Sequence, residues 1–146
     1  MGAEARLNDR LTSYWNTLRK EETLPEFARF NASVVEDLWS QCVLFTVQPT
    51  APGQPPAVNF YQVGEKVKAL YGNVAGRSMN TTQRHFQGAS IVQRVGDVIA
   101  APAPLYDEGQ FINERSKVVK YRSCLLPFGT KDKVTHVVAG LSWREF

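Results

Sequence analysis

Histidine and cysteine are scarce in this sequence, which limits the chemistry that it can carry. Two histidines and two cysteines stand among 146 residues, whereas a structural zinc site needs four converging ligands. Neither His85 nor His136 is followed, three or four positions later, by a residue that suits zinc. The sequence therefore predicts no metal site.

Long apolar runs are also missing. The longest uncharged one, Cys42–Val47, is far shorter than the roughly 20 residues that cross a bilayer. Residues 1–10 are polar and charged and do not resemble a signal peptide. We therefore expect a cytoplasmic protein without membrane insertion.

Charge of one sign is not concentrated in any segment. The 17 basic residues are interleaved with 14 acidic ones, and the net charge is +3. Phosphate binding needs a clustered basic face, which the sequence does not show. We expect no nucleic-acid partner, and a chain of this length and ordinary composition is one domain.

Motifs for covalent or acid–base catalysis are absent too. Ser90 and Ser123 lack the Gly-x-Ser-x-Gly elbow that exposes a nucleophile. Asp107 and Glu108 are neighbours in a predicted strand, so their carboxylates point to opposite faces. The loop 129–132 contains Gly-Thr-Lys but lacks the upstream glycine and the following helix of a phosphate-binding loop. The sequence therefore predicts no enzyme.

The first element that the sequence predicts is an amphipathic helix from Glu4 to Glu22. Pro25 lies beyond its end, where the residue before proline disfavours helix. Apolar residues recur along one side of this helix at helical spacing. They are Leu7, Leu11, Tyr14, Trp15 and Leu18.

Helix and strand patterns then alternate along the chain. Ser33 and Glu36 have the spacing of a capping box, which predicts a short helix to about Trp39. Asn80–Thr82 suits the start of a long helix from about Thr82 to Ala100. The predicted strands are Cys42–Val47, covered on both faces, Val58–Val63, Ala103–Ile112, Lys117–Phe128 and Lys133–Trp143.

A strand, a turn and a short helix follow one another from Tyr61 to Gly72. Gly64 ends the strand, and Val67, Leu70 and Tyr71 recur at helical spacing. This segment, followed by Gly76-Arg77, resembles the first half of a PAS domain. The chain also resembles the compact bacterial PAS branch, which carries a Tyr-Trp-containing N-terminal helix and a Leu-Leu-Pro strand ending, here Tyr14-Trp15 and Leu125-Leu126-Pro127.

The resemblance implies an α+β fold, in which a five-stranded antiparallel sheet of order 2-1-5-4-3 carries helices on one face. It divides the chain into an N-terminal helix and connector (1–32) and a PAS-like domain (33–146). In that order the strands of Cys42 and Cys124 are separated by the fifth strand, beyond the reach of a disulfide. We therefore expect two buried thiols.

The resemblance further implies a non-enzymatic sensory or regulatory module of bacterial signalling, acting through a small ligand, a partner protein or both. A ligand would lie between the long helix and the sheet, against Tyr71, Arg77, His85, Tyr121 and Trp143. The apolar stripe of the N-terminal helix would pack on its own sheet, form a homodimer or bind a signalling partner. No particular cofactor is predicted, and the Asn-Cys-Arg-Phe-Leu context of flavin-binding photosensory PAS domains is absent.

One alternative fold stays open on the sequence alone. A cone-shaped α+β barrel, as in small isomerase-like or transport-factor-like proteins, also combines an N-terminal helix with a curved antiparallel sheet. Such a protein would be an enzyme or a carrier. The position of the helices distinguishes the two, because the barrel gathers them before the sheet, whereas a PAS domain places them between its second and third strands.

Overall fold

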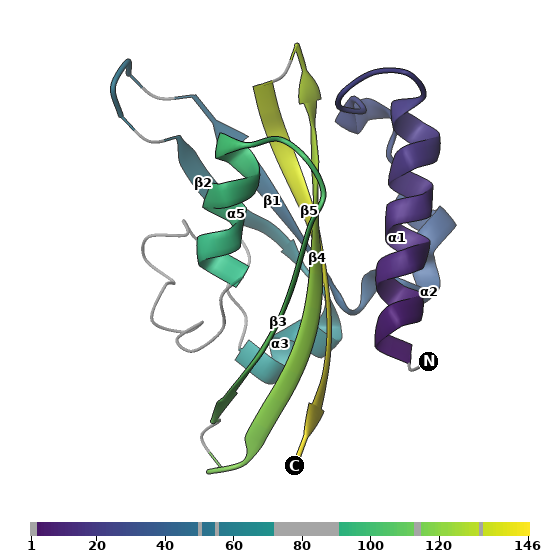
Figure 1. Cartoon of the computed structure of the whole chain (residues 1–146), viewed down its shortest axis with the longest axis vertical. Helices are drawn as coiled ribbons and strands as arrows, with labels where there is room; N and C mark the ends of the chain where they lie inside the picture. Colours follow the sequence, from purple (N-terminus) through teal and green to yellow (C-terminus); the bar gives the residue numbers. More distant parts are fainter. Residues whose placement is uncertain (1–2, 50, 55, 72–90, 113–114, 132) are drawn as a thin grey trace.

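The computed structural model describes residues 3–49, 51–54, 56–71, 91–112, 115–131 and 133–146. Its helices are α1 (Ala3–Arg19), α2 (Glu36–Trp39), α3 (Glu65–Tyr71) and α5 (Ile91–Ala100), with 3₁₀ turns η1 (Phe27–Arg29) and η2 (Ala32–Val35). Its strands are β1 (Cys42–Gln48), β2 (Ala57–Val63), β3 (Leu105–Ile112), β4 (Val118–Thr130) and β5 (Lys133–Glu145). Figure 1 shows their arrangement.

The five strands form one antiparallel sheet in the order β2-β1-β5-β4-β3, as predicted. The barrel alternative is wrong, because α3 and α5 stand between β2 and β3 in the chain. Of the predicted long helix, the described part is α5; its earlier turns lie outside the described residues.

The inner face of the sheet, which carries α3 and α5, is apolar. Strand residues alternate between the two faces, and the inward set packs against Val67 of α3 and Val95 and Val98 of α5. The strand members of this inner core include Val43, Phe45, Phe60, Tyr121, Leu125, Val137, Ala139 and Leu141. α3 and α5 therefore pack on this face of the sheet.

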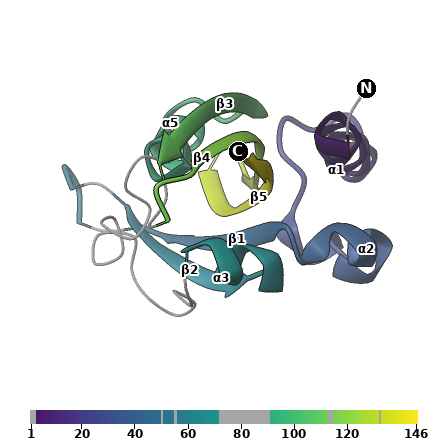
Figure 2. The same cartoon turned by 90° about the horizontal axis from the view of Figure 1, so that it is seen from below.

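The outer face is covered by α1, which lies on the opposite side of the sheet from α5 (Figures 1 and 2). Leu7, Leu11 and Trp15 are buried there against Leu126 and Val138 of the sheet. The Trp15 indole N–H donates a hydrogen bond to the Pro127 carbonyl at 2.6 Å. Side chains of β4 and β5 therefore contribute to a core on each face of the sheet.

The connector after α1 returns along the same outer face. Phe27 stacks on His136 with ring centroids 4.0 Å apart and meets Phe128 edge-on at 5.5 Å. The predicted capping box is wrong, since the Asn31 side chain, not that of Ser33, accepts the backbone N–H at the start of η2. The reason is that the helical segment starts with the 3₁₀ turn η2, whose first residue, Ala32, lies one position before the expected cap, Ser33.

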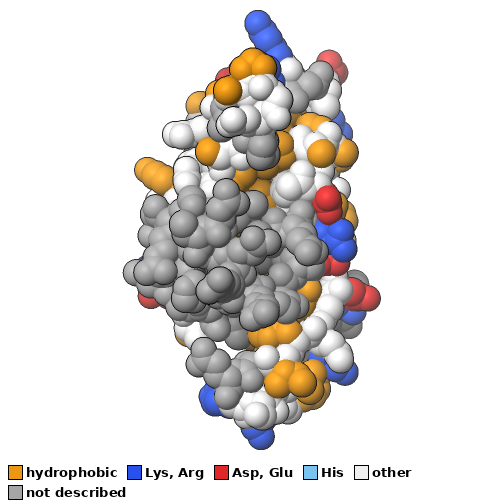
Figure 3. All heavy atoms as spheres, turned by 90° about the vertical axis from the view of Figure 1, so that its left-hand side faces the viewer, with side chains coloured by type: hydrophobic (Ala, Val, Ile, Leu, Met, Phe, Trp, Pro, Cys, Tyr) orange, Lys and Arg blue, Asp and Glu red, His pale blue; other side chains and the backbone are white. Residues whose placement is uncertain are grey.

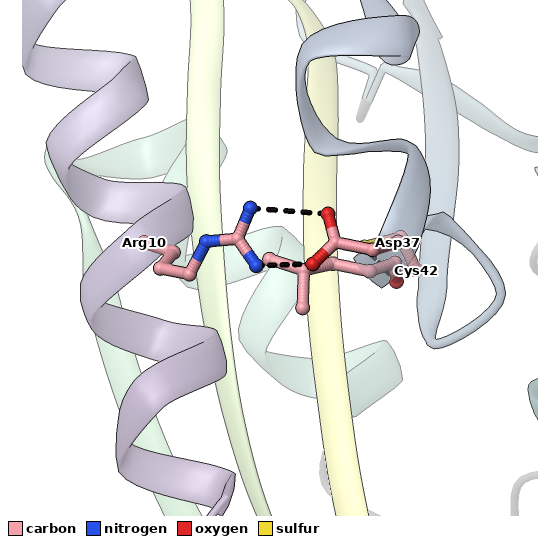
Figure 4. A network of polar contacts seen from close by, with 4 residues as sticks. Arg10, Asp37 and Cys42 are labelled. Carbon is pink, nitrogen blue, oxygen red and sulfur yellow. Dashed lines mark hydrogen bonds and ion pairs between the residues drawn. The ribbon is translucent and has the colours of Figure 1, made fainter.

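An ion pair ties α1 to α2 across the outer side (Figure 4). The Arg10 guanidinium donates two hydrogen bonds to the Asp37 carboxylate, one of them at 3.0 Å. This bidentate contact lowers the pKa of Asp37. Both groups are solvent-exposed, so the pair fixes the relative position of α1 and α2 more than it stabilises the fold.

Candidate functional site

Two of the five predicted ligand-binding residues lie together on the inner face. Tyr121 of β4 and Trp143 of β5 are direct cross-strand partners, and both belong to the inner core, Trp143 being only partly buried. Tyr71 is the last residue of α3, and its side chain lies outside what the structure describes; Arg77 and His85 are outside the described residues. A pocket made by all five stays a prediction.

The position of Tyr121 depends on a glycine in the neighbouring strand. Gly109 of β3 is its cross-strand partner. A Cβ atom at Gly109 would lie 2.7 Å from the Tyr121 hydroxyl oxygen, which is closer than real side chains approach. Gly109 therefore gives the phenol ring room to lie across β3, with the Phe111 ring centroid 6.1 Å away.

Ser123 is a buried residue of β4 on the inner face. In the sequence it was considered only as a possible nucleophile. It lies between Asp107 of β3 and Leu141 of β5, and none of its surface is exposed to solvent. Among the described residues its hydroxyl oxygen has no hydrogen-bond partner, although buried hydroxyls almost always have one. The signal in the sequence was a single serine among the alternating inward residues of β4.

Asp107 holds α5 against β3 from the same side. Its carboxylate oxygen lies 3.6 Å from Nε of Arg94, whose guanidinium also binds Asp97 at 3.0 Å. The side chain of Asp107 is 15% exposed while that of Glu108 is 74% exposed. The two carboxylates point to opposite faces as predicted, but Asp107 is not a solvated residue, because α5 covers it.

The apolar stripe of α1 is buried by the chain's own sheet. Leu7, Leu11 and Trp15 are 2%, 2% and 4% exposed, and Tyr14 and Leu18 are partly buried beside them. A second copy or a partner could contact the three buried side chains only after α1 left the sheet. A dimer or partner interface on this stripe stays a prediction.

Both thiols lie on the outer face, beneath α1. Cys42 and Cys124 are free and buried, and each is the cross-strand partner of Gly140. Burial raises the pKa of Cys124 to about 12 and that of Cys42 well above its usual range. Because the thiolate is the reactive form, these thiols are unreactive in the folded protein.

Two features are absent from the described residues. In that part of the chain, no group of three or more His, Cys, Asp and Glu side chains could hold a metal ion. None of the helices described is both long and apolar enough to span a membrane.

Sheet order and helix placement define an α+β domain of the PAS and light-oxygen-voltage type. The family model described as "PAS domain" matches residues 4–142, nearly the whole chain. The chain therefore belongs to the PAS domain family. PAS domains are typically non-enzymatic modules that serve sensory signalling and commonly bind small ligands or other proteins.

Several solved structures are similar to the chain at low sequence identity. The chain is similar to a light-oxygen-voltage domain studied with a flavin analogue (14% identity, 77% of this chain and 84% of that chain covered, TM-score 0.50). It is also similar to the light-oxygen-voltage domain of the photoreceptor Aureochrome1 (11%, 77% and 88%, TM-score 0.49) and to a PAS domain from Colwellia psychrerythraea (11%, 78% and 94%, TM-score 0.44). No curated protein matches the chain.

Flavin-binding photosensory PAS domains carry a cysteine in an Asn-Cys-Arg-Phe-Leu context, which this sequence lacks. The sequence has two cysteines, and both lie on the outer face beneath α1. Neither cysteine therefore lies on the inner face, where Val67 of α3 and Val95 of α5 pack.

Proposed function

We propose that this protein is a non-enzymatic sensory or regulatory module of bacterial signalling, located in the cytoplasm, which binds a small molecule on the inner face of its sheet. The observation that carries the proposal is the buried hydroxyl of Ser123, for which the described part of the chain provides no hydrogen-bond partner. It stands in the same strand as Tyr121, on the same face.

The chemistry of this face indicates the kind of ligand. An unsatisfied buried hydroxyl costs about 1–3 kcal/mol, and a ligand that hydrogen-bonds to it would recover this free energy. The rings of Tyr121 and Trp143 offer apolar contact beside it. A small, mainly apolar compound with one hydrogen-bonding group fits these features, and Tyr71, Arg77 and His85 complete the site in this proposal.

The output of such a module would pass through another protein chain. In this proposal residues 33–146 bind the ligand, and residues 1–32 transmit the change to a second copy or a signalling partner. Leu7, Leu11 and Trp15 pack on the same two strands, β4 and β5, that carry Ser123 and Trp143 on their other face. A change in the packing of these strands would therefore reach α1 directly.

The test starts with protein purified from its own host, examined by native mass spectrometry and absorption spectroscopy for a retained compound. Ser123→Ala should lower the affinity for that compound about tenfold, the loss expected for one hydrogen bond. Ser142→Ala is the matched control, because Ser142 is also buried and lacks a hydrogen-bond partner in the residues that the structure describes, but it lies on the outer face. Equal effects of the two substitutions, or a protein that retains no compound, would contradict ligand binding at Ser123.

A further inference from the structure

An open hollow lies on the outer side of the molecule, between α1 and the strands β3 and β4 (Figure 2). Its volume is about 730 Å³. The hydroxyl groups of Thr12 and Tyr106, 2.9 Å apart, join α1 to β3 at this place. The residues that line the hollow are polar or amphipathic: Asn8, Asp9, Thr12, Ser13, Tyr106 and Arg122.

The α1 wall of the hollow carries a hydrogen-bonding group without a partner. The side-chain oxygen of Asn8, Oδ1, is shielded from solvent, and no described residue donates a hydrogen bond to it. Because no such bond holds the amide in place, rotation about its last side-chain bond can turn the oxygen toward the hollow that Asn8 lines. A ligand with an N–H group would supply the missing donor.

Charges of both signs stand at the hollow. Asp9 is exposed, and its carboxylate makes no ion pair with another described residue. Arg122 contacts Glu108, with 3.4 Å between Nε and the carboxylate oxygen, and the two side chains are 54% and 74% exposed. An exposed pair of this kind contributes little free energy, so Arg122 can turn to the carboxylate of a ligand.

Charged side chains on the other side of the molecule differ from Asp9 in this respect. On the α5 side, acidic and basic side chains stand next to one another along one edge of the described surface (Figure 3). Within α5, Arg94 contacts Asp97 at 3.0 Å. The charge of Asp9 has no such neighbour among the described residues and is open to a ligand.

An aromatic ring adds apolar surface to the hollow. Tyr106 is 54% exposed, although its hydroxyl group is bonded to Thr12. Its ring is therefore partly open to contact. Apolar surface beside a few polar groups is the usual composition of a small-molecule site.

From these features we propose that the hollow binds a free α-amino acid with an apolar side chain. Its ammonium group would donate to the Asp9 carboxylate and the Asn8 amide oxygen, and its carboxylate would accept from the Arg122 guanidinium. Its side chain would pack on the ring of Tyr106. A ligand of one charge is disfavoured, because a simple cation would meet Arg122 and a simple anion would meet Asp9.

This site would act on the position of α1, because its contacts come from α1 on one side and from β3 and β4 on the other. The inference goes beyond the proposed function, which places a ligand on the inner face of the sheet. Ser123→Ala should accordingly leave amino-acid binding in the hollow unchanged, and Arg122→Gln should leave binding on the inner face unchanged. The two ideas can therefore fail separately.

The experiment compares three compounds by NMR titration of the full chain. They are L-phenylalanine, phenethylamine, which lacks the carboxylate, and 3-phenylpropionate, which lacks the ammonium group. L-Phenylalanine should shift the backbone amides of Asn8 and Arg122. It should also bind about tenfold or more tightly than either of the other two, because each of them loses one charge-assisted contact.

Two variants test which residue holds which group. Arg122→Gln should raise the Kd for L-phenylalanine about tenfold and change that for phenethylamine less than about twofold. Asp9→Asn should weaken L-phenylalanine to a similar degree without weakening 3-phenylpropionate. The matched controls Lys66→Gln and Glu36→Gln remove the same charges from exposed positions outside the hollow, and should leave the Kd for L-phenylalanine within about twofold.

Several results would overturn the proposal: no shift of Asn8 and Arg122 by L-phenylalanine, equally tight binding of phenethylamine or 3-phenylpropionate, or equal losses in Arg122→Gln and Lys66→Gln. Shifts confined to Tyr121 and Ser123 would place the amino acid on the inner face and would equally contradict binding in the hollow. Should a variant fail to fold, the comparison of the three compounds on the unmodified protein decides.

Discussion

Gly64, at the end of β2, shows how one residue can be required for a reason that a sequence pattern does not reveal. The sequence predicted only that Gly64 ends the strand. In the structure the Gly64 N–H donates to the Cys42 carbonyl at 2.8 Å, and an added Cβ would lie 2.5 Å from the Trp39 carbonyl oxygen and closer still to that of Ser40. The requirement is therefore space between two backbone segments.

Alanine substitutions at two glycines should have opposite effects. Gly64→Ala should destabilise the protein by about 3 kcal/mol, because backbone atoms cannot move aside as a flexible side chain can. Gly96 is an exposed position of α5, with no atom within 4 Å of an added methyl group. Gly96→Ala should therefore stabilise the protein by about 0.5–1 kcal/mol. Urea denaturation of both variants measures this, and a harmless Gly64→Ala would contradict the close approach.

The two buried thiols predict how stability falls at high pH. Their usual pKa is 9.0, and burial raises it in the folded state, so the unfolded chain loses these protons first. The contribution of the thiols to stability is therefore complete below pH 9 and declines as pH rises toward about 12 for Cys124, by up to about 1.4 kcal/mol per pH unit for each thiol. Between about pH 8 and pH 10 the natural protein should lose about 3 kcal/mol more than Cys42→Ala/Cys124→Ala does. Equal slopes in the two proteins would show that the thiols are not buried.

At the scale of elements, β2 shows which part of a strand can be predicted. The bounds of every predicted strand lie within two residues of the observed ones, because periodicity and turn residues mark where strands begin and end. The facing of side chains in β2 departs from simple alternation: alternation places Gln62 on the same face as Phe60, but Gln62 is exposed and Val63 is buried. A bulge shifts the β1–β2 register between Leu44 and Phe45, and no local pattern announces it.

The N-terminal helix also separates what a pattern predicts from what it leaves open. Spacing alone predicted α1 and its apolar stripe. Whether that stripe packs on its own sheet depends on a distant glycine: a Cβ at Gly140 would meet Leu11 and Cys124, so Gly140 lets α1 approach the sheet closely. Residues more than 100 positions apart set this contact, which is why the sequence left both uses of the stripe open.

α1 should depend on one buried hydrogen bond. Trp15→Phe keeps most of the ring but removes the donor to the Pro127 carbonyl, and should cost about 2 kcal/mol because that carbonyl would be left unsatisfied. Thr17→Ala, on the exposed side of the same helix, should change stability by less than about 0.5 kcal/mol. The urea midpoint measures both. A loss for Trp15→Phe as small as that for Thr17→Ala would contradict a tightly docked α1.

At the scale of the whole molecule, the candidate site was predictable in part. Tyr121 and Trp143 were placed on the inner face because strand alternation and sheet order fix which residues meet. Ser123 and the Arg94–Asp107 contact were missed as features of the site. The neighbours of a lone serine or of a distant charge pair are known only once β3, β4, β5 and α5 are placed together. The residues that sequence analysis overlooks are thus those whose role depends on neighbours from several elements.

The two-sided core predicts that residues 33–146 do not behave as an independent soluble unit. Removing residues 1–32 would uncover Leu126, Phe128 and Val138 on the outer face, which are 2% exposed or less in the full chain, and would create a continuous apolar patch. We expect the shortened chain to bind 8-anilinonaphthalene sulfonate and to self-associate, as seen by dye fluorescence and sedimentation. Arg10→Ala in the full chain is the control: it breaks the exposed ion pair to Asp37 but leaves α1 on the sheet, so dye binding should not change. A shortened chain that stays monomeric and binds no dye would show that α1 is an appendage, rather than the second wall of the core.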